Sequence, residues 1–252
     1  MSHMDSLISK AVDQVARRLG LSFSRIDDVI LQDSTFMEYY RICRPYTMTS
    51  LERMFALYIA TNYVLASGIK GDFVECGVWK GGSALLIALI LKDAHVVDRK
   101  IYLYDTFEGM VEPDDIDHRI ANYKIRAHDI WKKNATQSGS TWCDATLGEV
   151  KKIMRISQYP VKNLVYIKGK VEQTIPKVMP STISLLRLDT DWYVSTKHEL
   201  NHLYPRLTKS GVLLIDDYGY WAGSKKAVDQ YFDHKPILLQ RIDNSSRMLV
   251  KQ

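Results

Sequence analysis

The sequence lacks the cysteine pairs that form structural zinc sites, redox motifs and disulfide frameworks. Its three cysteines, Cys43, Cys76 and Cys143, lie far apart along 252 residues, and such isolated cysteines are typical of reduced thiols inside the cell. No apolar run approaches the roughly 20 residues that a transmembrane helix needs. These absences argue against a disulfide scaffold and predict no membrane span, so we expect a cytoplasmic protein.

Long runs of charge of one sign are also absent. Lys and Arg number 34 against 29 for Asp and Glu, which gives a formal net charge of +5. The basic residues are scattered in small groups such as Lys132-Lys133 and Lys151-Lys152. Nucleic-acid-binding domains usually gather them in a patch or stripe. The composition therefore gives no special support to nucleic-acid binding, including RNA methylation. An anionic small substrate or cofactor would account for the slight excess of positive charge as well as a nucleic acid would.

Short apolar runs alternate with helical patterns after about residue 68. Most of the runs do not alternate with polar residues, as expected for strands buried on both faces of a parallel sheet. Helical patterns at 83–91 and 194–207 lie between them. This order predicts an α/β fold with a doubly wound sheet, ending in a hairpin over 236–241 and 248–251. The strands are expected at 72–75, 101–104, 164–167, 183–188 and 212–215.

The first part of the chain predicts helices rather than strands. Apolar residues recur at helical spacing over 7–19 and again over 51–59, where Ser50 or Thr49 is the expected N-cap. We therefore predict an N-terminal helical extension over residues 1–68, followed by one α/β domain over 69–252.

An insertion at about residues 108–147 interrupts the alternation of strands and helices. Its composition is polar with scattered aromatic residues, and it contains no clear strand. An insertion of this length in a compact domain is usually a lid or a disordered excursion. Because 116–120 and 129–131 have helical patterns, we predict a helical lid.

A turn containing three glycines follows the first predicted strand and leads directly into a helix. Glycine lets the backbone turn sharply and approach a ligand closely, and the first helical N–H groups face that ligand. In an open α/β sheet this turn is the usual place for a nucleotide-like cofactor. Trp79 stands where the dinucleotide fingerprint needs its second glycine, so an oxidoreductase is less well supported. The turn is Glu75-Cys76-Gly77-Val78-Trp79-Lys80-Gly81-Gly82-Ser83.

Carboxylates end the first two predicted strands. Asp105, after the second strand, is placed to accept hydrogen bonds from ribose hydroxyls, and Glu75 suits an ammonium group at the other end of the cofactor. S-adenosylmethionine offers both groups and has no pyrophosphate. The alternative is that both acids only cap helices.

Four aspartates follow the fourth and fifth predicted strands, whose carboxyl ends lie side by side. Such crowding of like charge is costly unless a cation or shared protons relieve it. Oxygen ligands suit Mg²⁺, Mn²⁺ or Ca²⁺. A metal would lower the pKa of an acceptor hydroxyl, and a nearby carboxylate could take its proton. Salt bridges to Arg187, Lys225 or Lys226 are the structural alternative. The aspartates are Asp189, Asp191, Asp216 and Asp217.

Together these motifs resemble the macrocin O-methyltransferase (TylF/MycF) family of sugar O-methyltransferases from natural-product pathways. The similar stretches follow the family's order over nearly the whole chain, which makes the match specific. They are Tyr46-Thr47-Met48-Thr49-Ser50, residues 73–83, Tyr104-Asp105-Thr106-Phe107-Glu108-Gly109-Met110, residues 188–193 and residues 215–219.

The resemblance implies a class I methyltransferase with a Rossmann-like fold, S-adenosylmethionine as methyl donor, Mg²⁺ (or Mn²⁺) at the active site and a homo-oligomer. The insertion becomes a lid over the sugar. Asp191 is the expected general base, and Asp189 can share that role. Asp189, Asp216 and Asp217 are expected to hold the metal. The donor is expected to contact Met48, Glu75, Gly77, Gly81, Ser83, Asp105, Thr106 and Phe107, although Met48 suits core packing equally well.

The expected reaction is methylation of a sugar hydroxyl in a natural product or glycoconjugate. A phenolic or catechol-like acceptor is an alternative, since a phenol ionises more easily than an alcohol and the same carboxylates serve either. A non-catalytic nucleoside-binding module is another alternative. It is disfavoured because cofactor binding alone requires none of the four aspartates.

Overall fold

The computed structural model describes residues 28–137 and 139–252. The chain divides into two units, Met1–Met37 and Glu38–Gln252. In the first unit, α2 (Asp28–Gln32) is followed by the start of α3 (Ser34–Cys43), where the Asp33 carboxylate accepts a hydrogen bond from the backbone N–H of Phe36. The helical pattern at 7–19 lies outside the described residues.

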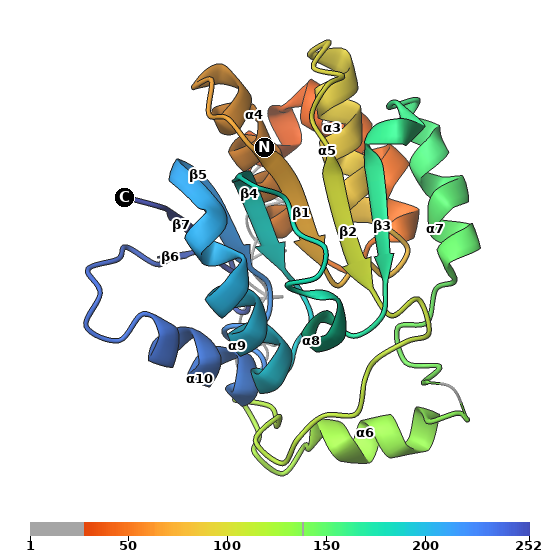
Figure 1. The fold of residues 1–252 in the computed structure, drawn as a ribbon, viewed down its shortest axis with the longest axis vertical. Helices are drawn as coiled ribbons and strands as arrows, with labels where there is room; N and C mark the ends of the chain where they lie inside the picture. Colours follow the sequence, from red (N-terminus) through yellow and green to blue (C-terminus); the bar gives the residue numbers. More distant parts are fainter. Residues whose placement is uncertain (1–27, 138) are drawn as a thin grey trace, which may run out of the picture. The chain divides into compact units, whose positions relative to one another are not determined.

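The second unit is built around a seven-stranded sheet with the order β3-β2-β1-β4-β5-β7-β6 (Figure 1). The first five strands are parallel, and the hairpin formed by β6 and β7 adds antiparallel to β5. From β1 the chain adds β2 and β3 on one side, and it then returns to add β4 and β5 on the other side. In open α/β sheets, ligands bind at the carboxyl ends of the strands beside such a switch in strand order, here between β1 and β4. The strands are β1 (Asp72–Cys76), β2 (Ile101–Asp105), β3 (Leu164–Lys168), β4 (Ile183–Leu188), β5 (Leu207–Ile215), β6 (Gln240–Arg241) and β7 (Arg247–Val250).

Helices cover both faces of this sheet. On one face α4 packs on α5, and on the other α9 packs between α8 and α10 (Figure 1). Helix α5 is buried from Gly82 to Leu91, which explains why its sequence is apolar on all sides. The second unit therefore includes α4, which the sequence assigned to an N-terminal extension. The helices are α4 (Leu51–Ala66), α5 (Gly82–Asp93), α7 (Leu147–Met154), α8 (Val171–Thr174), α9 (Tyr193–His202) and α10 (Ala222–Tyr231).

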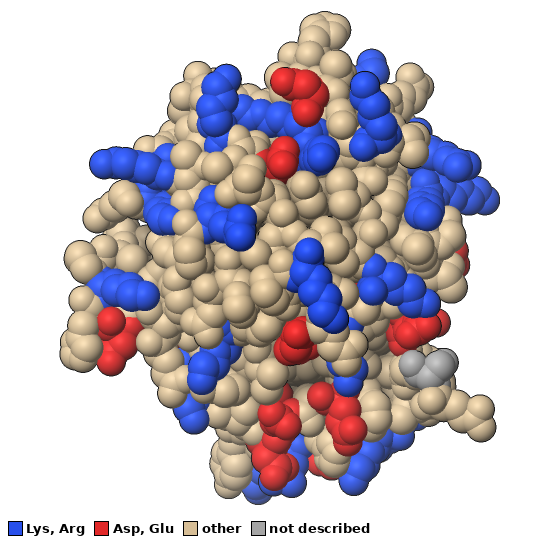
Figure 2. Space-filling view, viewed as in Figure 1, with Lys and Arg blue, Asp and Glu red and all other residues tan. Residues whose placement is uncertain are grey.

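The structure confirms the doubly wound sheet and the terminal hairpin, and it places Ser50 as the N-cap of α4. The predicted helix over 194–207 ends early, because Pro205 lies in a 3₁₀ turn (Tyr204–Arg206) and Leu207 already begins β5. Among the described helices none combines the length and apolar character of a membrane span. On the face shown in Figure 2, Lys and Arg lie in separated groups, as the scattered sequence positions predicted.

The insertion at 108–147 lies beyond the carboxyl ends of the strands (Figure 1) and contains α6 (Ala127–Asn134). The helix predicted at 116–120 is wrong. Residues there form β-bridges instead, His118 with Arg126 and Arg119 with Trp221. A helix of five residues is too short to be stable by itself, whereas the Arg119–Trp221 bridge ties this segment to the loop after β5.

Asp117 anchors the insertion to the loop after β4. Its buried carboxylate accepts hydrogen bonds from the backbone N–H groups of Tyr193 and Asp114, each at 2.9 Å. Tyr193 is the first residue of α9, so Asp117 satisfies one of the N–H groups that a helix start leaves free. Gly223, in the first turn of α10, makes room for this carboxylate, because a Cβ there would lie 1.7 Å from the Asp117 Oδ1 atom.

Gly223→Ala should therefore displace Asp117 and weaken the attachment of the insertion. We expect a loss of about 1–3 kcal/mol in the free energy of unfolding, the usual cost of overpacking a buried site. Urea denaturation, combined with proteolysis of the insertion, measures both effects. Gly148→Ala in α7 is the matched control, since its Cβ meets nothing closer than 4.0 Å. Equal stability and equal proteolysis of the two variants would contradict this role of Gly223.

Candidate active site

Two cavities that share Asp189 lie at the carboxyl ends of β1, β2, β4 and β5. The larger, of about 430 Å³, lies between the segment 46–49, the β1–α5 loop, the ends of β4 and β5 and the insertion. The smaller, of about 60 Å³, lies beside Asp105, Thr106 and the residues that follow β3 (Gly169–Glu172). The carboxyl ends of the strands therefore supply side chains to two cavities that have Asp189 in common.

The glycine turn after β1 packs tightly against the end of β4. Gly77 has a φ of +82°, and a Cβ there would lie 2.0 Å from the backbone oxygen of Asp189. Only glycine fits this combination of conformation and contact. Gly81, also left-handed, is the N-cap of α5, and Ser83 lines the larger cavity. The predicted cofactor loop and the predicted catalytic loop are thus in direct backbone contact.

Asp105 holds this glycine turn in place. One carboxylate oxygen accepts the backbone N–H groups of Val78 at 2.7 Å and Trp79 at 3.0 Å, and the other accepts that of Phe107 at 2.7 Å. Burial nevertheless raises the pKa of Asp105 above its usual range, against the lowering effect of these hydrogen bonds. Contact with a ribose stays a prediction, but the structure shows that Asp105 also shapes the loop that a ribose would approach.

A buried ion-pair network crosses the carboxyl ends of the strands, and Arg187 in β4 is its centre. Its guanidinium contacts Glu75 in β1 at 2.6 Å, Asp189 at 2.8 Å and Asp216, after β5, at 2.8 Å. Arg187 and Glu75 are 4% and 1% exposed, so the pairing takes place out of water. Glu75 is occupied by Arg187 on one oxygen, while its other oxygen is buried without a hydrogen-bond partner among the described residues.

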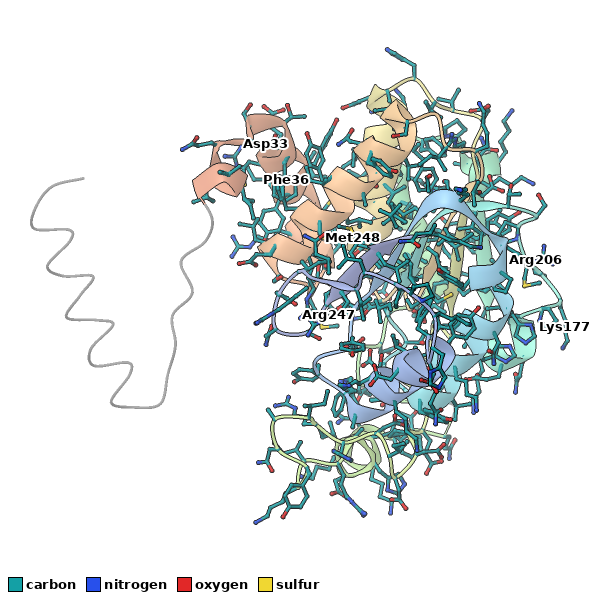
Figure 3. All side chains as sticks on the ribbon, turned by 90° about the vertical axis from the view of Figure 1, so that its left-hand side faces the viewer. Asp33, Phe36, Lys177, Arg206, Arg247 and Met248 are labelled. Atoms are coloured by element: carbon teal, nitrogen blue, oxygen red, sulfur yellow. The ribbon has the colours of Figure 1, made fainter. Side chains whose placement is uncertain are left out.

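Arg53 of α4 extends the network to the terminal hairpin. Its guanidinium pairs with the second oxygen of Asp216 at 2.5 Å and with Asp243 at 2.7 Å. The Ser245 hydroxyl in turn donates to the backbone oxygen of Asp216. Arg247, which Figure 3 labels beside Met248 on β7, donates to the carbonyl oxygens of the same turn. Asp216 is therefore held by two arginines. The structural alternative holds for its pairing with Arg187, whereas Arg53 was not expected as a partner and Lys225 pairs with Asp229 instead.

Three carboxylates, one of them the Asp189 that also pairs with Arg187, gather in the larger cavity. Asp189, Asp191 and Asp217 each offer an oxygen within 4.8 Å of the others. Asp191 lies close to Asp217 and to the Trp221 side chain, and a hydrogen bond between the two carboxyl groups would require a proton on one of them. Oδ2 of Asp217 is buried without a partner among residues 28–137 and 139–252. The structure thus groups Asp191, rather than Asp216, with Asp189 and Asp217.

Crowding makes these acids hard to ionise together. Burial, with the charge of Asp189 adding to it, raises the pKa of Asp191 to about 7. Burial and the neighbouring carboxylates raise the pKa of Asp217 well above its usual range. Asp189 shifts in the same direction through burial, although Arg187 opposes the shift. Like charges so close together are the condition that a bound cation or a shared proton relieves.

The backbone aims Asp191 into the cavity at some conformational cost. Asp191 has a φ of +69°, a left-handed conformation that is uncommon outside glycine, although Asp and Asn adopt it more readily than most residues. The neighbouring Thr190 is fixed by α9, because its hydroxyl donates to the buried Glu199 carboxylate at 2.9 Å and its carbonyl accepts from Trp192 N–H at 2.8 Å. Backbone strain held by surrounding bonds in this way is typical of functional sites.

Of the remaining predicted residues, Met48 and Thr106 line the cavities and Phe107 does not. Met48 is 62% exposed and lines the larger cavity, so the core-packing alternative for it is wrong. Thr106 lines the smaller cavity, and Phe107 is buried with a left-handed backbone beside Asp105. The sequence did not assign roles to Arg53, Arg119 and Trp221. It named Arg187 only as a structural partner, although an arginine inside a buried strand is itself a signal of a buried ion pair.

Arg187→Gln should strongly destabilise the protein. Removing one partner of a buried ion pair leaves the other charges uncompensated and typically costs about 3–5 kcal/mol. Chemical denaturation measures the change, and Arg241→Gln, an exposed arginine of the terminal hairpin, is the control. A loss below about 1 kcal/mol, the range of an exposed pair, would show that the network contributes little to stability.

Comparison with known proteins agrees with this architecture. The family model described as Macrocin-O-methyltransferase (TylF) matches residues 41–249. A demethyldecarbamoylnovobiocin O-methyltransferase of Streptomyces niveus is 29% identical over 206 residues, which cover 79% of this chain and 75% of that protein. The 8-demethyl-8-(2,3-dimethoxy-alpha-L-rhamnosyl)-tetracenomycin-C 4'-O-methyltransferase of Streptomyces olivaceus is 31% identical over 186 residues, covering 74% of this chain and 67% of that protein.

The structure resembles solved methyltransferases in the same way. It superposes on the O-methyltransferase NovP with a TM-score of 0.70 at 26% identity, over 82% of each chain. The family match spans both cavities, the glycine turn and all four aspartates. The chain belongs to the macrocin O-methyltransferase family of S-adenosylmethionine-dependent O-methyltransferases.

Proposed function

We propose that this enzyme methylates a sugar hydroxyl of a natural product or glycoconjugate and uses a divalent cation, Mg²⁺ or Mn²⁺, to do so. The observation that carries the proposal is the group of three carboxylate oxygens within 4.8 Å of one another in the larger cavity. A relative that is 29% identical is a mycinamicin III 3''-O-methyltransferase of Micromonospora griseorubida. Its name, like that of the tetracenomycin enzyme, specifies a position on an attached sugar or substituent rather than on a nucleic acid.

We assign the donor to the two cavities together. The adenosine part belongs at the smaller cavity beside Asp105 and Thr106, and the amino-acid part belongs at the glycine turn, near Ser83 and Met48. At about 60 Å³ the smaller cavity is below the roughly 300–1,000 Å³ of ordinary ligand sites. Met110 and Val111 of the insertion line it, so we expect these residues to move when the nucleoside enters.

The cluster of Asp189, Asp191 and Asp217 supports the proposal of a divalent-cation site. All three donors are oxygens, which Mg²⁺ and Mn²⁺ prefer, and Oδ2 of Asp217 is buried without a hydrogen-bond partner among the described residues. Asp189, Asp191 and Asp217 would hold the ion, with Asp216 supporting them from its position between two arginines. The cation would supply positive charge next to the acceptor hydroxyl and lower its pKa.

Asp191 is our choice for the residue that takes the hydroxyl proton. One oxygen of Asp189 is paired with Arg187 at 2.8 Å and its other oxygen would bind the cation, so neither is left for the proton. Asp191 has no arginine partner among the described residues, and its second oxygen would remain available when the first binds the cation. As the hydroxyl oxygen bonds to the methyl carbon, its proton passes to Asp191 and the carbon–sulfur bond breaks. The bonding electrons stay on sulfur, which leaves a neutral thioether. Since this transfer needs the oxygen, carbon and sulfur in line, the main task of the two cavities is alignment.

A phenolic acceptor is the alternative. A flat apolar pocket would favour it, and the larger cavity does contain Trp142, Trp221 and Tyr220. The same cavity also presents Thr47, Thr49 and Arg119, and this number of polar groups suits an acceptor with several hydroxyls better.

Calorimetric titration with S-adenosylhomocysteine tests the donor site, with NAD as the negative control. We expect saturable binding of S-adenosylhomocysteine alone. Asp105→Ala should weaken it by about 10- to 100-fold, the effect of losing a hydrogen bond to a charged group. Asp98→Ala, an exposed aspartate just before β2, should bind as the wild type does. Unchanged affinity in Asp105→Ala would remove this residue from the donor site.

Asp217→Asn tests the cation site. We expect it to weaken Mg²⁺ or Mn²⁺ binding by at least the roughly 10- to 100-fold that loss of an outer-shell partner costs at a metal site, with donor binding retained. Mn²⁺ binding followed by magnetic resonance gives a readout that does not need the acceptor. Asp233→Asn, whose side chain is 67% exposed, is the control. If both variants bind Mn²⁺ like the wild type, Asp217 is not a ligand.

A further inference from the structure

One arginine in the larger cavity forms no ion pair with a carboxylate of the described residues. The cavity is lined by Arg53, Arg119 and Arg187. Arg187 pairs with three carboxylates and Arg53 with two. Among the ion pairs formed within residues 28–137 and 139–252, none includes Arg119, and its buried Nε atom has no hydrogen-bond partner there.

The position of Arg119 is nevertheless well defined. Its backbone N–H donates to Ile125 at 3.0 Å, and it pairs with Trp221 in a β-bridge. The guanidinium lies over the ring of Tyr220, 4.6 Å from the centroid. A guanidinium stacked on an aromatic face keeps the N–H groups along its edge available. Arg119 is thus a fixed, half-buried cation on the wall of the acceptor cavity.

An arginine in this state is suited to one kind of ligand. A half-buried charge without a partner carries a desolvation cost that an opposite charge repays. The planar fork of N–H groups matches the two oxygens of a carboxylate or phosphate better than it matches a single hydroxyl. Under the proposed function the carboxylates of Asp189, Asp191 and Asp217 would bind the cation, so they would not compete with an anionic acceptor for Arg119.

We propose that Arg119 determines acceptor specificity by binding an oxyanion group of the acceptor, a carboxylate or phosphate attached to the sugar. The inference rests on the proposed function, because it assigns the larger cavity to the acceptor. It narrows the substrate class from sugars in general to acidic or phosphorylated sugars. Arg119 positions such an acceptor, while the aspartates act on its hydroxyl.

The test compares sugars that differ in charge. Protein saturated with S-adenosylhomocysteine and Mg²⁺ is titrated calorimetrically with methyl glucoside, glucuronate, glucose 1-phosphate and a nucleoside diphosphate glucose. We expect at least one anionic sugar to bind roughly 10- to 100-fold more tightly than the neutral one, as for a charge-assisted pair. Preference for glucuronate indicates a carboxylate on the ring, and preference for the other two indicates a phosphate.

Variants assign the preference to Arg119. Arg119→Gln should lower the affinity for the anionic sugar to that of the neutral one. Arg119→Lys keeps the charge without the planar fork and should retain part of the preference. Arg126→Gln is the control from the same insertion, since its side chain is 54% exposed and its partner Asp115 lies at 3.7 Å; it should behave as the wild type does.

Several results would overturn the inference. They are equal binding of charged and neutral sugars, no binding of any anionic sugar, and a preference that survives in Arg119→Gln. A preference that survives this substitution but disappears without Mg²⁺ would place the anion on the metal instead. The S-adenosylhomocysteine titration of the same samples keeps the two proposals apart. If the wild type binds no S-adenosylhomocysteine, the proposed function fails; if it binds without anion preference, only the role of Arg119 fails.

Discussion

The ion pair between Arg187 and Glu75 sets the geometry on which the site depends. Both side chains are buried, and taking such charges out of water costs several kcal/mol per ion unless each finds its partner. Glu75 of β1 lies directly beside Arg187 of β4 in the sheet register, and Leu214 of β5 lies on the other side. A slip of one residue would turn Arg187 to the opposite face. The charge pairing therefore reinforces the register that brings the strand ends together.

The same network sorts the carboxylates into two groups. Asp216 and Asp243 are neutralised by Arg53 and Arg187, and they connect the sheet to α4 and the terminal hairpin. Asp191 and Asp217 have no arginine partner among the described residues, and Asp189 has one on a single oxygen. Arg53 and Arg187 are already paired and Arg119 forms no ion pair with these acids among the described residues, so a cation or shared protons would relieve the remaining charge. The fold thus separates structural acids from those available for chemistry.

Sequence patterns predicted the sheet and the edge where the acids meet, because buried parallel strands are apolar and their carboxyl ends share one edge. They could not show that Asp216 belongs to the arginine network rather than to the carboxylate cluster. Its second partner, Arg53, comes from a helix distant in the sequence and binds through its side chain. The prediction of a helix at residues 116–120 was wrong for a related reason. Their short apolar pattern suits a helix, but the backbone pairs with Trp221 and Tyr220 in the loop after β5. Contacts between distant segments decided both cases.

These backbone pairings also connect the insertion to the two loops that carry the carboxylate cluster. The loop after β5 carries Asp217 and pairs with Arg119 and Ile120, while Asp117 binds the first N–H of α9, two residues after Asp191. Moving the insertion away from the sheet would therefore break its contacts with both loops that carry Asp189, Asp191 and Asp217. Arg119 enters the cavity on this same bridge and is held by main-chain bonds that do not depend on its side chain. Under the proposed function, a change at residue 119 would therefore alter acceptor recognition while the carboxylates keep their positions, so that specificity and catalysis would be separable within one small connection.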